Sequence, residues 1–66
     1  MKKNLYKVVF ESYEENKVSA FNAIEASILA QAKRIESNKP YTVRYVERMS
    51  DYGAFEAVSV ARLEVI

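Results

Sequence analysis

The sequence predicts a small α+β domain, in which a single helix packs on a mostly antiparallel sheet of three to four strands. Three observations lead to this prediction: the short chain, one segment of strong helix formers, and strand-forming segments on both sides of it. With 66 residues the chain supports one domain at most, so we predict a single domain over residues 1–66. A domain of this size buries only about 60% of the surface of its unfolded chain. One sheet covered by one helix is about the largest core that it can build alone.

The first strand is predicted over residues 5–10, where aromatic and β-branched side chains dominate. The polar cluster over residues 12–17 ends this strand and has the composition of a turn. Residues 17–20 are predicted to return as a short second strand.

The helix is predicted to begin at Asn22, a residue type that is favoured as an N-cap, with Glu25 three residues later in the position of a capping-box partner. The residues up to Ile35 are mostly strong helix formers, and Ile24, Ile28 and Ile35 recur with a helical period. Asn38 and Pro40 then end the helix.

The second half of the chain predicts a hairpin. Residues 41–49 alternate and are rich in strand formers, and residues 50–53 have turn chemistry with the only glycine of the chain. Residues 55–66 form the last predicted strand. The predicted order is therefore strand, short strand, helix, strand, strand.

Composition excludes several classes of function. The chain has no cysteine and no histidine, so it has no disulfide framework, thiolate metal site or imidazole ligand. It contains no glycine-rich phosphate loop and no clustered carboxylates, so we predict no enzyme, no cofactor and no metal. The absence of disulfides favours a cytoplasmic protein. No apolar run approaches the roughly 20 residues of a membrane span, so we predict no membrane partner.

Apolar residues on both faces of the predicted strands indicate a binding partner. One helix of about 14 residues spans roughly 21 Å and covers only one face of a sheet. A second apolar face would stay in water, which monomers seldom tolerate above a few hundred Å². We therefore expect a homodimer or an obligate partner, with Val46, Val58 and Val60 at the interface.

Five tyrosines are candidates for contacts, because tyrosine is enriched at interface hot spots. Three of them lie in predicted strands and are expected to pack there: Tyr6, Tyr41 and Tyr45. Tyr13 and Tyr52 lie beside predicted turns, where a role in the core is harder to arrange. These two are the stronger interface candidates.

Arginines on the predicted last two strands allow an alternative function. Arg44 and Arg48 share one strand face, and Arg62 approaches them from the neighbouring strand. Basic and aromatic residues on an open sheet hold single-stranded nucleic acid in several folds. Glutamates interleave with these arginines, and Arg–Glu pairs across neighbouring strands account for the arginines equally well. The net charge of +1 also gives no strong electrostatic attraction for nucleic acid.

Two stretches resemble small bacteriophage proteins. Residues 6–12 match the strand or hairpin of this pattern, and residues 18–26 carry its phrase V-x-A-x-N-A-x-E-A, which leads into a helix. The build is similar to that of small phage inhibitors of host RNA polymerase, over about the first half of the chain. Those inhibitors are more acidic where they touch their target, and no functional residue is carried over. The resemblance implies an accessory protein of a phage or mobile element.

The leading functional hypothesis is a small non-enzymatic homodimeric protein that binds and modulates a host or phage protein. The first alternative is a small single-stranded nucleic-acid-binding protein that uses Arg44, Arg48 and Arg62. The second alternative is a structural subunit of a larger assembly.

Overall fold

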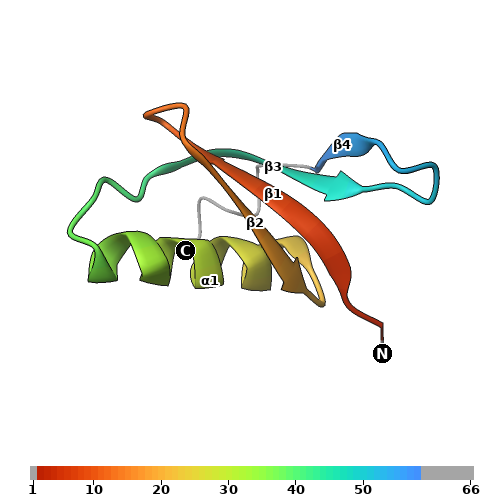
Figure 1. Ribbon diagram of the computed structural model, residues 1–66, viewed down its shortest axis with the longest axis horizontal. Helices are drawn as coiled ribbons and strands as arrows, with labels where there is room; N and C mark the ends of the chain where they lie inside the picture. The colour runs from red at the N-terminus through yellow and green to blue at the C-terminus, as the bar shows by residue number, and fades with distance from the viewer. Residues whose placement is uncertain (1, 59–66) are drawn as a thin grey trace.

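The structure, a computed structural model, describes residues 2–58 and confirms the predicted α+β fold with one helix on an antiparallel sheet (Figure 1). The elements follow the chain in the order β1 (Asn4–Phe10), β2 (Glu15–Ala20), α1 (Ala23–Glu36), β3 (Val43–Met49) and β4 (Phe55–Val58). The short second strand expected over residues 17–20 is real and begins two residues earlier.

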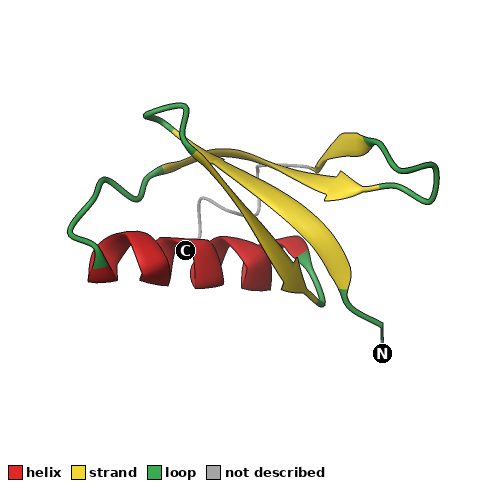
Figure 2. Cartoon of the chain, viewed as in Figure 1, coloured by secondary structure: helices red, strands yellow, loops and turns green. Residues whose placement is uncertain are grey.

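The four strands form one antiparallel sheet in the order β2-β1-β3-β4. β1 therefore lies inside the sheet, between its hairpin partner β2 and the strand that follows the helix. Helix α1 lies along one face of this sheet, as Figure 2 shows. The prediction that the helix covers a single face is confirmed.

The turn between β1 and β2 is tight and contains an unusual backbone conformation. Tyr13 has φ of 68°, in the left-handed region that bulky residues seldom adopt. Its N–H donates to the Phe10 carbonyl at 2.8 Å, and the Phe10 N–H donates to the Glu14 carbonyl at 2.9 Å. These bonds close the hairpin and hold the Tyr13 side chain at its tip.

The capping residues of α1 act as the sequence predicts. The Asn22 Oδ1 accepts a hydrogen bond from the Glu25 N–H at 2.8 Å, and the Glu25 Oε1 accepts one from the Phe21 N–H at 3.0 Å. This reciprocal pair is a capping box. At the other end, Asn38 has φ of 56°, a conformation that asparagine tolerates and that ends the helix.

The core lies between α1 and the helix-facing side of the sheet. It consists of large side chains from the strands and small ones from the helix: Tyr6, Val8, Phe10, Val18, Ala20, Ala26, Ala30 and Val46. The apolar residues that the helix contributes to this core are therefore small ones.

A β-bulge changes the expected faces of β3. Val9 of β1 pairs with Tyr45, but the next residue, Phe10, pairs with Val43, so the register shifts by one residue. Val43 and Val46 therefore both pack on the core side, although strict alternation would place them on opposite faces.

This arrangement corrects part of the predicted interface. Val46 is completely buried beneath the helix, so the expectation that it contacts a partner is wrong. Val58 lies opposite Val46 on β4 and is half-buried against the same core, not on an open second face. Val60 and Arg62, predicted for the interface and for nucleic-acid binding, lie outside the described residues.

Candidate protein-binding surface

Helix α1 turns its largest apolar side chains outward. Ile24, Ile28 and Ile35 are 38%, 48% and 56% exposed, whereas Ala26 and Ala30 are completely buried. The apolar stripe of a surface helix normally faces the core. Here the alanines occupy that position, and the isoleucines form an apolar surface that the other described residues leave partly exposed.

Five residues in and just before α1 follow the spacing of a coiled-coil seam. Phe21, Ile24, Ile28, Gln31 and Ile35 are separated by steps of three, four, three and four residues. This alternation is that of the a and d positions of a heptad; the last four of these residues lie in one line along α1, whereas Phe21 precedes its N-cap. We call these five residues the helix stripe; none of them is charged.

Tyr41 borders the helix stripe from the segment between α1 and β3. With Ile28, Gln31, Ala32 and Ile35 it lines a shallow surface cavity of about 300 Å³. The Gln31 Nε2 donates a hydrogen bond to the Tyr41 carbonyl at 3.0 Å. This bond ties the polar residue of the stripe to its own chain and leaves the rest of the cavity wall mainly apolar.

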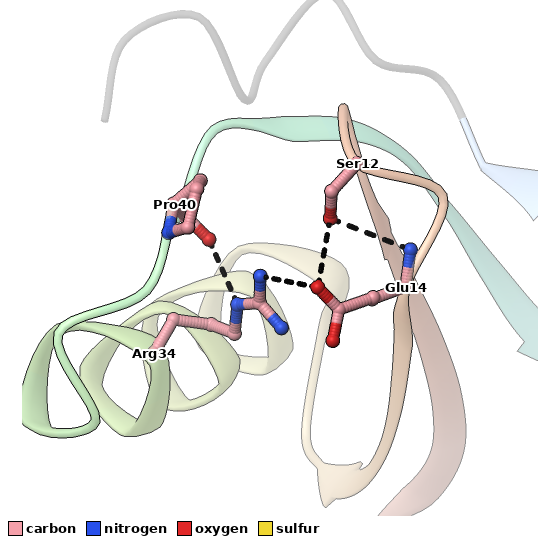
Figure 3. A network of polar contacts seen from close by, with 4 residues as sticks. All are labelled: Ser12, Glu14, Arg34 and Pro40. Carbon is pink, nitrogen blue, oxygen red and sulfur yellow. Dashed lines mark hydrogen bonds and ion pairs between the residues drawn. The ribbon is translucent and has the colours of Figure 1, made fainter.

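A buried arginine holds the segment that carries Tyr41 (Figure 3). Arg34 is only 5% exposed, and its Nε donates to the Pro40 carbonyl at 2.8 Å. Its guanidinium also donates to the Glu14 carboxylate at 3.1 Å and lies over the Phe10 ring, 4.8 Å from the ring centroid. Arg34 thus joins the helix, the β1–β2 turn and the connection to β3, and this fixes the position of the cavity wall.

The same contact changes the acidity of Glu14. The hydrogen bond and the positive charge of Arg34 lower the pKa of the Glu14 carboxyl below its ordinary value of 4.5. The Ser12 hydroxyl donates a further hydrogen bond to this carboxylate at 3.3 Å. Glu14 is therefore ionised at neutral pH and serves as an anchor for Arg34.

The sheet face away from the helix is not a continuous apolar patch. Lys7 lies on it and pairs with Glu47 at 3.2 Å and with Glu15 at 4.0 Å. Its ammonium also lies 4.7 Å from the centroid of the Phe55 ring. The hydrogen bond to Glu47 raises the pKa of Lys7 above 10.5. In the described part of the chain, the helix stripe is therefore the better candidate for a covered apolar surface.

The two turn tyrosines are exposed, as expected for contact candidates. Tyr52 is 94% exposed at the β3–β4 turn, and Tyr13 is 72% exposed at the β1–β2 turn. The Arg44 guanidinium lies 4.9 Å from the centroid of the Tyr13 ring. Of the three tyrosines expected to pack, Tyr6 is buried and Tyr45 is half-buried, while Tyr41 is 50% exposed beside the helix stripe.

The structure separates the arginines of the nucleic-acid hypothesis. Arg44 lies at the bulge and contacts Tyr13, whereas Arg48 lies on the helix-facing side of the sheet, opposite Glu56. Arg48 and Glu56 line a second cavity of about 330 Å³ with Tyr6 and Val58. Because Arg44 and Arg48 do not share one face, the described residues give no continuous basic path along the sheet.

Two further features bear on the site. Over residues 2–58 there is no group of three acidic, histidine or cysteine side chains arranged to hold a metal ion. The helix in this range is too short and too polar to cross a membrane.

Comparison with family models, with curated proteins and with solved structures finds no match to this chain.

The sequence pattern predicted the helix but not the outward orientation of its isoleucines. The three-four spacing is visible in the sequence, yet an apolar helical period normally marks the side that packs on the core. In the structure, Ala26 and Ala30 pack against the strand side chains of the core. This orientation of the helix leaves the helix stripe on the outside.

Proposed function

We propose that this chain is a non-enzymatic protein-binding module, and that the helix stripe with Tyr41 is its docking surface. The observation that carries the proposal is the outward orientation of Ile24, Ile28 and Ile35. A helix that packs with alanines and exposes isoleucines keeps its apolar surface for another protein, since contiguous exposed apolar patches on monomers commonly mark interaction sites.

The composition of the surface supports docking of a protein and not of a charged ligand. Ile28, Ala32 and Ile35 are apolar, Tyr41 adds an aromatic ring, and the helix stripe contains no charge. Interface cores are depleted of charged residues and enriched in aromatic residues. The partner that fits such a surface presents an apolar side chain that can enter the cavity beside Tyr41.

The resemblance of residues 6–26 to small phage proteins suggests the kind of protein on which the chain acts. In this proposal the chain acts as a homodimer on a host or phage protein and modulates that protein by occupying one of its surfaces. Modulation requires no chemistry from the chain itself, which agrees with the lack of histidine and cysteine.

Site-specific photo-cross-linking in the producing cell tests the proposal. A photoreactive amino acid replaces Ile28 in one variant and Tyr52 in the control variant, because both side chains are exposed but only Ile28 lies on the helix stripe. We expect covalent protein adducts at position 28 that are absent or much weaker at position 52. Equal adducts at both positions, or none at position 28, would contradict the proposal.

A further inference from the structure

The cavity beside Tyr41 has the geometry of a coiled-coil hole. In knobs-into-holes packing, one side chain enters a hole made by four residues at positions i, i+3, i+4 and i+7 of the facing helix. Ile28, Gln31, Ala32 and Ile35 have this spacing and line the cavity of about 300 Å³. Ala32 leaves the floor of the hole open, and Tyr41 closes one side.

The four residues of the helix stripe that lie on α1 are also complementary to themselves. The midpoint of α1 (Ala23–Glu36) falls between Leu29 and Ala30, and this is also the midpoint between Ile24 and Ile35 and between Ile28 and Gln31. A two-fold axis through this point aligns two antiparallel helices over their full length, roughly 21 Å. Ile24 then lies opposite Ile35 of the second copy, and Ile28 enters the hole.

From this geometry we infer that the occupant of the helix stripe is a second copy of the same chain, paired as an antiparallel, two-fold-symmetric helix pair in which each Ile28 fills the hole of the other copy. The inference rests on the proposed function, because it names the partner of the same surface. Symmetric pairing fills the cavity of both copies at once, because an isologous interface uses the same surface on each copy.

An antiparallel pair is favoured over a parallel one for two reasons. Antiparallel helices bring the positive N-terminal end of each dipole beside the negative C-terminal end of the other. A parallel pair would also place the two Gln31 side chains against each other. Two polar amide groups would then occupy the level at which the antiparallel pair places Ile28 of the other copy against Gln31, and polar groups in an apolar seam lower its stability.

The area predicts a modest affinity. The helix stripe and Tyr41 comprise six side chains, none more than 56% exposed, so the paired surface is smaller than that of a standard stable interface. We therefore expect a dimer that dissociates on dilution.

Cysteine cross-linking of the full chain tests this arrangement directly, since the chain has no cysteine of its own. Two single variants are prepared, Ile24→Cys and Ile35→Cys, both at exposed positions. In the antiparallel pair, position 24 lies opposite position 35, whereas two copies of position 24 are about 16 Å apart along the axis. A disulfide requires Cα atoms within about 7 Å.

We expect mild oxidation to join Ile24→Cys to Ile35→Cys in an equimolar mixture and to leave each variant alone mostly uncross-linked. Cross-linking of each variant with itself would indicate a parallel pair and overturn the inference. No cross-link in the mixture, with both variants folded and monomeric by sedimentation, would overturn it as well.

Thiol labelling of the cysteine variants and the photo-adducts at position 28 distinguish the other possible occupants of the helix stripe, namely the chain itself and a different protein. A folded monomer whose cysteine at position 24 reacts slowly would show that the chain covers its own stripe, and this also overturns the inference. If position 28 forms photo-adducts only with other proteins, the proposed function stands and the self-pairing fails. The two proposals can therefore fail separately.

Discussion

At the residue scale, Arg34 shows how a buried charge can order a small fold. Its guanidinium is satisfied by the Pro40 carbonyl and the Glu14 carboxylate and stacks on Phe10, so the desolvated charge has partners on three sides. Glu14 is half exposed, so solvent screens its ion pair with Arg34. The hydrogen bond to Pro40 and the contact with Phe10 therefore carry much of the anchoring.

Acid should weaken this anchor in a way that depends on Glu14. The pKa of Glu14 is lowered in the folded state, so its stabilising contribution is complete above the ordinary value of 4.5 and is lost as the pH falls through the lowered value. We expect the urea midpoint of the wild type to decrease over that acid range more than that of Glu14→Gln, which lacks the titrating carboxyl. Parallel pH profiles of the two proteins would show that the pair does not contribute.

At the element scale, the helix is the best-defined part of the chain. Its capping box is complete, with Asn22 bonded to the Glu25 N–H and Glu25 bonded to the Phe21 N–H. These bonds satisfy backbone donors that have no partner within the helix. The boundaries of the helix, and with them its midpoint between Leu29 and Ala30, are therefore set by local chemistry.

Replacement of the cap should destabilise the domain measurably. Asn22→Ala removes the acceptor for the Glu25 N–H, and we expect a loss of about 1 kcal/mol in the free energy of unfolding. The control Asn22→Ser keeps a capping oxygen and should stay within a few tenths of a kcal/mol of the wild type. Urea denaturation of the three proteins measures the difference. An equal loss in both variants would mean that the cap is not the cause.

Local signals predicted the elements better than the faces. Asn22 and Glu25 placed the start of the helix correctly, and the composition of residues 5–10 located β1 to within one residue. The strand predicted from Tyr41 begins only at Val43, because the preceding segment is held by Arg34 and Gln31 and not by the sheet.

The face of Val46 could not be derived from alternation, because the bulge depends on the pairing of β3 with β1. The outward face of the helix stripe could not be derived either. It depends on how much of the space between the layers Tyr6 and Phe10 fill, and this is known only once the sheet has formed.

At the scale of the whole molecule, a four-stranded sheet and one helix make a closed core without using the isoleucines of α1. A chain this small has little apolar surface to spare. Three isoleucines of α1 lie outside the core of the described residues, and this supports the proposal that the folded unit is completed by contact with another protein. The central claim is that this contact is made through the helix stripe.

The most direct measurement is sedimentation equilibrium of the purified chain over a wide concentration range, together with two variants of α1. Ile28→Gln alters the knob and the hole, whereas Leu29→Gln is a matched control on the same helix, since Leu29 is 41% exposed but lies outside the stripe. We expect a reversible dimer for the wild type and Leu29→Gln. For Ile28→Gln we expect dimerisation to weaken by about 100-fold, because each dimer loses two buried isoleucines. A wild-type monomer at all concentrations, or equal weakening by both substitutions, would contradict self-docking through the helix stripe.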